Sequence, residues 1–196
     1  GIQIKNINNK ITLPVWIEQK LERSGIGSIN PVVDIVNFVL IEMGQPLHAF
    51  DQSKISGEIS VRRASKNESL QLLNDQNIKL EGIELIIADE QGPLALAGIM
   101  GGDFSATNTN TTEVFIESAY FDPTHIAGRA RSFGLNTDSS HRFERGVDFI
   151  GTSSALQRAA ALIVEFCGGE CSNILNIENN LPKREPIKLR TKRVTD

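Results

Sequence analysis

The sequence contains very little cysteine, histidine or tryptophan and has no excess of positive charge. Its 196 residues include two cysteines, three histidines and one tryptophan. Two cysteines give no disulfide framework, and no spacing of histidine and cysteine fits a metal site, so we predict that no metal is bound. A formal net charge of −4 argues against a general nucleic-acid-binding protein, which needs an excess of Lys and Arg to neutralise phosphates. DNA is therefore not an expected partner.

Long apolar segments are absent too. No run approaches the roughly 20 residues that cross a bilayer, and the start of the chain shows no secretory signal. With so little cysteine, the sequence predicts a reduced, cytoplasmic setting and no membrane partner.

Four segments carry helical patterns, at residues 14–24, 30–43, 123–132 and 152–166. The second has the best signals, because Asn30 is suited to cap it, Pro31 suits the first turn and Gly44 ends it. Asn37 lies at the boundary of the face that this helix would bury.

Short apolar runs in the middle of the chain predict buried strands at residues 59–63, 85–88, 94–97 and 114–116. The polar residues 89–92 form a hairpin-type turn between the second and third of them. Strands flanked by helices predict a mixed α/β (α+β) fold. Its core would be a layered β-sheet or sandwich, largely antiparallel because the turns are short, with helices on the outside.

The boundaries of this fold are predicted from the same patterns. We expect a linker and a short helix in residues 1–29, the main domain in residues 30–180, and a linker with the start of a further domain in residues 181–196. The alternating residues 187–190 resemble a first strand of that further domain, so the chain is interpreted as a fragment of a larger polypeptide.

A glycine-rich loop, residues 97–102, follows a predicted strand. Small residues there let a ligand approach the backbone, whose amides can bind carbonyls or oxyanions. The spacing fits neither a Walker loop nor a dinucleotide fingerprint. A tight turn with a bulge is the structural alternative.

Two single residues are candidates for chemistry. His48 follows a glycine and a proline, so we expect it on a rigid loop, either as a structural residue or as a functional one. Glu117 ends an apolar strand, where a carboxylate either pairs with an arginine, such as Arg142 or Arg145, or points into a cavity. No Gly-x-Ser-x-Gly motif is present, and Cys167 and Cys171 are interpreted as packing residues.

Residues 137–148, Thr-Asp-Ser-Ser-His-Arg-Phe-Glu-Arg-Gly-Val-Asp, interleave charge with aromatic and apolar side chains. This pattern predicts a bonded network at the edge of a core, with Arg142 and Arg145 in structural salt bridges and His141 beside them.

Three motifs together, in this order, resemble one family. They are Gly-Gln-Pro-Leu-His-Ala-Phe-Asp at 44–51, Ala-Gly-Ile-Met-Gly-Gly at 97–102, and the segment 137–148. The chain resembles the beta subunit of bacterial phenylalanyl-tRNA synthetase, in the editing module formed by its intertwined third and fourth domains. The similarity runs from about Asn30 to about Gly169 and is weaker on either side.

The resemblance implies hydrolysis of tyrosine mischarged onto tRNA-Phe, by positioning of water and substrate without a metal or a covalent nucleophile. It implies that Glu117 recognises the phenolic hydroxyl, which phenylalanine lacks. The other implied roles are orientation of substrate and water by His48 and Asn37, walls of the pocket at Ala97, Gly98, Gly101, Thr137 and Ser139, and contacts of Arg129 and Arg131 with tRNA.

The implied partners are tRNA-Phe, the synthetase alpha subunit and tyrosine as editing ligand. We expect no cofactor for this segment, because ATP and Mg²⁺ would serve aminoacylation elsewhere in the synthetase.

The sequence departs from the family at Val36, where threonine is usual, and at Ser139, where alanine is frequent. Both changes put the strength of editing in doubt. A non-catalytic tRNA-binding or scaffolding module and a freestanding hydrolase of another aminoacyl ester are the alternatives.

Overall fold

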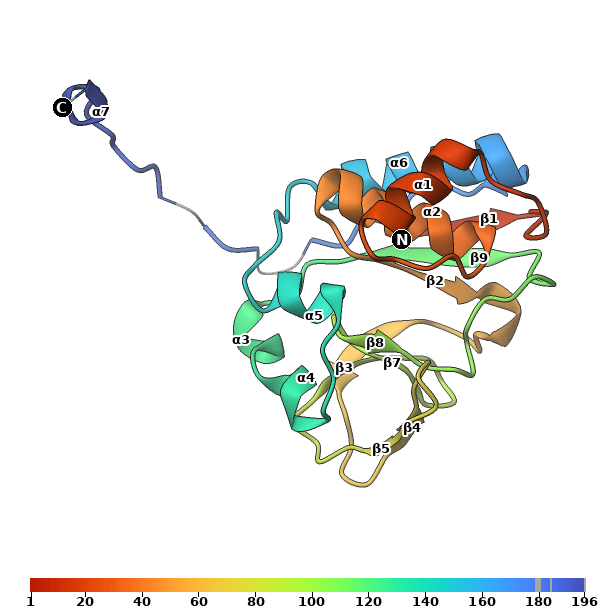
Figure 1. The fold of residues 1–196 in the computed structure, drawn as a ribbon. Helices are drawn as coiled ribbons and strands as arrows, with labels where there is room; N and C mark the ends of the chain where they lie inside the picture. The colour runs from red at the N-terminus through yellow and green to blue at the C-terminus, as the bar shows by residue number, and fades with distance from the viewer. Residues whose placement is uncertain (179–180, 184, 196) are drawn as a thin grey trace.

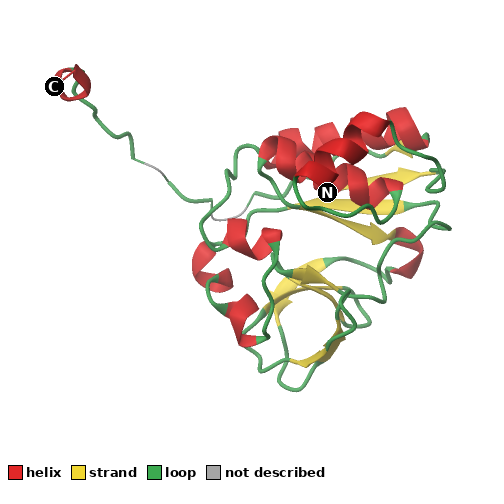
Figure 2. Ribbon diagram, in the orientation of Figure 1, coloured by secondary structure: helices red, strands yellow, loops and turns green. Residues whose placement is uncertain are grey.

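The computed structural model describes residues 1–178, 181–183 and 185–195. Two β-rich layers lie one above the other, and the longer helices cover the outer face of one of them (Figures 1 and 2). The described residues near the C-terminus run away from this body to the short helix α7, Lys192–Thr195. The predicted mixed α/β class, with antiparallel sheets flanked by helices, is confirmed.

The upper layer is a four-stranded antiparallel sheet in the order β10-β1-β9-β2. Its strands are β1 Ile2–Lys5, β2 Leu47–Asp51, β9 Val114–Ser118 and β10 Glu170–Cys171. Helices α1 Val15–Arg23, α2 Pro31–Met43 and α6 Thr152–Cys167 pack on one face. Ile4, Val39, Ile116 and Ile163 lie fully buried in the core between helices and sheet.

Helix α2 forms as its sequence predicts. The Val33 amide donates to the Asn30 side chain at 3.1 Å, Pro31 occupies the first turn, and Gly44 adopts the left-handed conformation that ends the helix, with φ of 73°. This helix contacts β2, so the cap also fixes where the strand after it begins.

The lower layer is a curled four-stranded antiparallel sheet in the order β3-β6-β7-β8, closed on one side by the ribbon β4-β5 (Figure 2). Its strands are β3 Ser60–Arg63, β4 Ser69–Gln71, β5 Asn77–Lys79, β6 Leu85–Ala88, β7 Pro93–Leu96 and β8 Met100–Gly101. The predicted hairpin turn at 89–92 is confirmed, because the Asp89 carboxylate accepts from the Gln91 and Gly92 amides.

Short helices connect the layers. They are the 3-10 helix η1 Gln52–Lys54 and helices α3 Pro123–Ile126, α4 Arg129–Ser132 and α5 Asp138–Phe143. The single helix predicted at 123–132 is instead two helices, because Gly128 takes a φ of +76° between them.

Segment 137–148 contains the predicted bonded network. Arg142 pairs with Asp138 at 3.1 Å, Arg145 pairs with Glu144 at 2.9 Å, and Arg145 contacts His141 Nδ1 at 3.1 Å.

Three expectations need correction. Residues 2–5 are an inner strand of the upper sheet and not part of a linker, because Ile2 and Ile4 bury their side chains while the backbone pairs with β9 and β10. Residues 187–190 form no strand in the described chain, where they have no strand to pair with. Cys167 is buried as expected, but Cys171 is exposed on the edge strand β10.

Among the described residues, no helix is both long and apolar enough to cross a membrane.

Candidate functional site

The alternation of side chains along β2 and β9 directs one pair of polar groups toward the lower layer. These strands pair Ala49 with Ile116, which lie in the core under the helices, and pair His48 with Glu117. Because successive residues of a strand point to opposite faces, His48 and Glu117 face away from the helices. They are direct cross-strand neighbours on the face that looks toward the second sheet.

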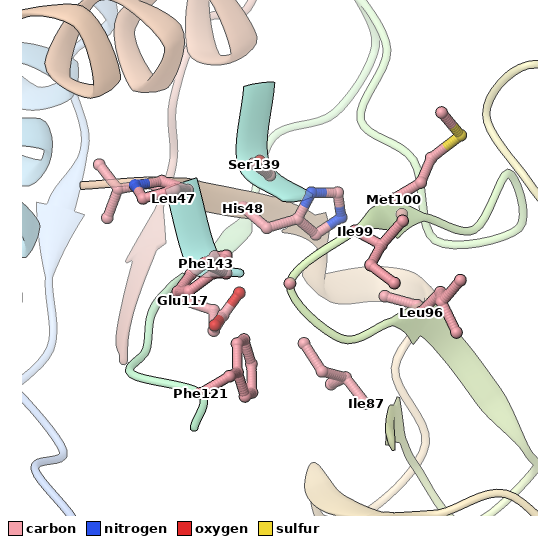
Figure 3. A pocket seen from close by; sticks show the side chains of 14 residues that line it. Leu47, His48, Ile87, Leu96, Ile99, Met100, Glu117, Phe121, Ser139 and Phe143 are labelled. Carbon is pink, nitrogen blue, oxygen red and sulfur yellow. The ribbon is translucent and has the colours of Figure 1, made fainter. Parts of the chain in front are cut away.

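A cavity of about 50 Å³ lies where the two layers meet (Figure 3). The start of β2, strand β7, the loop at 98–101, the end of β9 and helix α5 contribute its walls. His48, Glu117 and Ser139 are its polar side chains, and the rest of the lining is apolar or backbone. A dry, enclosed cavity that admits benzene is about 150 Å³, roughly three times this volume.

His48 lies on strand β2, so the expectation of a rigid loop was wrong. Its ring packs edge-to-face on Phe50, with centroids 4.4 Å apart and an interplanar angle of 79°. It also lies against Gly101, where an added Cβ would be 2.4 Å from His48 Cε1. Nε2 is buried and has no hydrogen-bond partner in the part of the chain that is described. Burial lowers the pKa of His48 to about 4, so the imidazole is neutral at pH 7.

Glu117 is half-buried, and its carboxyl group lines the cavity (Figure 3). Across residues 1–178, 181–183 and 185–195 it forms no side-chain hydrogen bond or ion pair, and the alternative pairing with Arg142 or Arg145 is absent. The positive charge of the Gly1 amino group still acts on it and favours its charged form. Burial raises the pKa of Glu117 to about 7, because the apolar surroundings disfavour the charged form. A carboxyl group in this position can accept a hydrogen bond from a ligand hydroxyl.

For the glycine-rich loop at residues 97–102, the sequence left two alternatives open, a tight turn and a wall of a binding site. In the structure the loop is a tight turn that also lines the cavity. Gly98 has a φ of +69°, and a Cβ on it would lie 3.0 Å from Phe121 and 3.1 Å from Phe143. Helix α5 is fastened to this loop, because the Thr137 hydroxyl donates to the Ile99 carbonyl at 2.8 Å. The hydrogen bond holds the loop backbone in place. Because residue 98 is a glycine, this backbone can lie directly against the rings of Phe121 and Phe143.

The structure brings five of the predicted site residues to one cavity, namely His48, Gly98, Gly101, Glu117 and Ser139. Ala97 and Thr137 do not line it. Ala97 is buried at the end of the β7 segment, and Thr137 caps α5 by accepting from the Ser140 amide at 3.0 Å.

Residues 36 and 37 lie on α2, on the other side of the upper sheet. Val36 is buried in the helical core, Asn37 is partly buried, and neither lines the cavity. Of the predicted tRNA contacts, Arg131 is exposed on α4, whereas Arg129 has its Nε buried without a hydrogen-bond partner among the described residues.

The sequence reasoning missed the apolar lining of the cavity. Ile87 and Leu96 were expected only as core residues of strands, and Phe121 was not considered. The one usable signal was Phe143, an aromatic residue inside the charged segment 137–148. Within the described ranges, no group of three or more His, Cys, Asp or Glu side chains could hold a metal ion.

The opposed titrations of His48 and Glu117 predict how stability depends on pH. The raised pKa of Glu117 means that the folded chain binds more protons than the unfolded chain between about pH 4.5 and 7, so stability falls as pH rises there. The lowered pKa of His48 means that the folded chain binds fewer protons between about pH 4 and 6.5, so stability rises with pH there. The two slopes oppose each other in the wild-type chain.

Each substitution should therefore expose the slope of the other group. The measurement is the free energy of unfolding in urea between about pH 4.5 and 6.5. As pH rises, it should increase for Glu117→Gln by up to about 1.4 kcal/mol per pH unit and decrease for His48→Ala by up to that amount. Parallel curves for wild type and both variants would show that neither group titrates in a buried setting.

The sequence was compared with protein-family models and with known proteins. The model of the B3/4 domain family matches residues 1–168. The chain is 51% identical over 189 residues to the phenylalanine–tRNA ligase beta subunit of Haemophilus influenzae, covering 95% of this chain and 24% of that protein. It is 49% identical over 193 residues to that of Pasteurella multocida, covering 97% of this chain and 24% of that protein. The chain thus spans about a quarter of the length of these relatives.

A solved structure shows the same fold. It is an N-terminal fragment of the phenylalanyl-tRNA synthetase beta subunit from Pyrococcus horikoshii, with a TM-score of 0.52 and 16% identity. The likeness covers 87% of this chain and 45% of the other, and at this identity it concerns the fold alone.

Proposed function

Because the chain belongs to the B3/4 domain family, we propose that it is the editing hydrolase of a phenylalanine–tRNA ligase beta subunit, clearing tyrosine mischarged onto tRNA-Phe. The observation that carries the proposal is the Glu117 carboxyl group, which has no hydrogen-bond partner among the described residues, beside His48 in a largely apolar cavity. The ligase assembly, with an alpha subunit and a cytoplasmic location, is part of the same proposal.

Discrimination between tyrosine and phenylalanine follows from the Glu117 carboxyl group as a hydrogen-bond acceptor. The tyrosyl hydroxyl donates to Glu117, whereas a phenylalanyl ring leaves that carboxyl group buried and unpaired. Sites built to bind a hydroxyl reject the analogue that lacks it by roughly 10⁴- to 10⁵-fold, while an apolar pocket discriminates weakly. Tyrosine is therefore the ligand that this cavity prefers.

Hydrolysis needs only the positioning of water against an ester that is already activated. Water adds to the ester carbonyl, the bond to the ribose oxygen breaks, and that oxygen takes up a proton. The neutral His48 imidazole can accept a hydrogen bond from the water or the ribose hydroxyl. A backbone amide of residues 98–101, other than that of Ile99, which donates to the Leu96 carbonyl, can bind the developing oxyanion. No covalent nucleophile or metal takes part, and ATP and Mg²⁺ serve aminoacylation elsewhere in the ligase.

The nucleic acid would reach this cavity along the side of helices α4 and α5. Arg131 is exposed there and is the better placed of the two predicted tRNA contacts, because Arg129 holds part of its guanidinium group in the interior. Phosphate contacts of this kind position the ligand without specifying it.

One observation favours a non-catalytic alternative. The cavity of about 50 Å³ is smaller than the roughly 150 Å³ of a dry cavity that admits benzene, and Ser139, where the sequence departs from the family, lines it. On this alternative the module binds tRNA or scaffolds the ligase.

The two functions are separated by deacylation in the complete synthetase that carries this chain. Editing predicts rapid hydrolysis of tyrosyl-tRNA-Phe and slow hydrolysis of phenylalanyl-tRNA-Phe. Normal aminoacylation without any deacylation would leave the scaffolding function.

The Gly101→Ala substitution should displace the His48 ring and slow this deacylation about 10- to 100-fold. The new methyl group would lie 2.4 Å from His48 Cε1 and 2.8 Å from Nε2, so the ring must move. Gly27→Ala is the matched control, because a Cβ there meets no atom within 4 Å. Full activity of Gly101→Ala in the deacylation assay would mean that the ring position does not matter.

A further inference from the structure

Gln45 joins the two strands that carry His48 and Glu117. It lies between the left-handed Gly44 at the end of α2 and Pro46 at the start of β2, and it is 4% exposed. Its side-chain amide nitrogen donates to the Pro46 carbonyl at 3.0 Å and to the Ala119 carbonyl at 2.9 Å. Because both neighbours are acceptors, the amide must present its nitrogen on this side.

This amide acts where the backbone pairing stops. The ladder between β2 and β9 ends at Leu47 opposite Ser118, so the next pair in register is Pro46 opposite Ala119. Proline has no N–H to donate to a neighbouring strand. The Gln45 side chain supplies a donor to Ala119 at this position.

The two anchored carbonyls lie close to the functional pair along each strand. His48 is two residues after Pro46, and Glu117 is two residues before Ala119. Beyond Ala119 the chain leads to Phe121, whose ring lines the cavity. One buried amide thus holds both strands at the end of the cavity where His48 and Glu117 face each other.

The Gln45 side-chain amide keeps this orientation although its oxygen atom is then buried without a hydrogen bond among the described residues. The Gln45 Oε1 atom is buried and has no hydrogen-bond partner within the described residues. An unpaired buried acceptor is unfavourable, and a methionine of similar length would avoid it.

We propose that Gln45 is a positioning residue, which sets the spacing between His48 and Glu117 by tying the Pro46 and Ala119 carbonyls together. The expected effect of Gln45 on catalysis rests on the proposed function, the hydrolysis of tyrosyl-tRNA-Phe. Gln45 touches no substrate and is not itself a catalytic residue.

The complete synthetase carrying Gln45→Met provides the first test. We expect the kcat for deacylation of tyrosyl-tRNA-Phe to fall about 10- to 100-fold, with KM changed by less than about twofold, because binding groups remain and their alignment is lost. The preference for the tyrosyl over the phenylalanyl ester should fall too, and aminoacylation should stay normal.

A matched control comes from Gln71→Met. Gln71 is exposed on β4 and also donates to a backbone carbonyl, that of Asp75 at 2.8 Å, but far along the chain from either strand. This variant should deacylate like the wild type.

The Gln45→Glu variant adds a pH signature that a loss of packing would not produce. A carboxylate there faces two carbonyl oxygens and repels them, whereas a protonated carboxyl group can donate to Ala119. Its deacylation rate relative to the wild type should therefore recover as pH falls. A ratio that does not change with pH would overturn the role of the donor.

A measurement independent of hydrolysis separates this inference from the proposed function. Modification of histidines in the holoenzyme by diethyl pyrocarbonate, followed by peptide mass spectrometry, reports the accessibility of His48 against the exposed His125 and His141. Gln45→Met should raise the relative rate at His48 several-fold, even if the wild-type enzyme deacylates nothing. Unchanged kcat, selectivity and His48 modification would overturn the proposal, and a lower melting temperature alone would leave Gln45 a purely structural residue.

Discussion

The Glu117→Ala synthetase is expected to lose its preference for tyrosyl-tRNA-Phe over phenylalanyl-tRNA-Phe by about 10²- to 10⁴-fold. The carboxyl group of Glu117 is the polar acceptor at the end of β9 that the tyrosyl hydroxyl can reach, and the substitution leaves an apolar wall in its place. Tyrosyl ester hydrolysis should fall, because the hydroxyl would then be buried without a partner. The measurement is kcat/KM for both esters at one enzyme concentration, in parallel with aminoacylation.

Two further variants test whether the effect comes from the loss of the acceptor at position 117. Glu117→Gln keeps an oxygen acceptor without charge, so its preference should lie between those of wild type and Glu117→Ala. Glu22→Ala removes an exposed carboxylate from α1, on the outer side of the helical layer, and should change neither ester. If Glu117→Ala retained the wild-type ratio, Glu117 would have no part in selecting tyrosine.

The second large effect is expected for His48→Ala, which should reduce kcat for deacylation by about 10²- to 10⁴-fold with the fold intact. The imidazole is neutral at pH 7 because burial lowers its pKa to about 4, so it can accept a proton or a hydrogen bond. The substitution removes that acceptor. It also removes a buried Nε2 that has no partner among the described residues, which limits the cost to stability.

His141→Ala is the control for this substitution. That histidine is exposed on α5 and contacts Arg145, away from the cavity lining. Circular dichroism and aminoacylation should be alike for both variants, and only His48→Ala should slow deacylation. A folded His48→Ala enzyme with wild-type kcat would remove His48 from the mechanism.

The Tyr/Phe ratio and the rate constant report different parts of the same cavity. Glu117 acts on the ring hydroxyl, so its loss should mainly change the ratio. His48 and the 98–101 loop act at the ester, so substitutions there should slow both esters together. This separation also distinguishes the editing function from the scaffolding alternative, under which no substitution would change deacylation.

Local signals in the sequence determined the two longest helices and the best hairpin. The cap at Asn30, the proline beside it and the stop at Gly44 act within a few residues, so α2 could be predicted nearly to its ends. The same holds for α6 and for the turn between β6 and β7. The residue types also determined the possible chemistry, because a carboxyl group at the end of an apolar strand has few uses.

Only the tertiary structure decided where these groups meet. Strands β1 and β2 are short and pair with β9, more than 60 residues away along the chain, and the alternation of apolar and polar residues in β1 spans only Ile2–Lys5. The register of β2 on β9 placed His48 on a strand opposite Glu117, and the sheet between α2 and the cavity separated Asn37 from both. Pairing and layering are contacts between distant segments, and a sequence read along its length contains the residues but not those contacts.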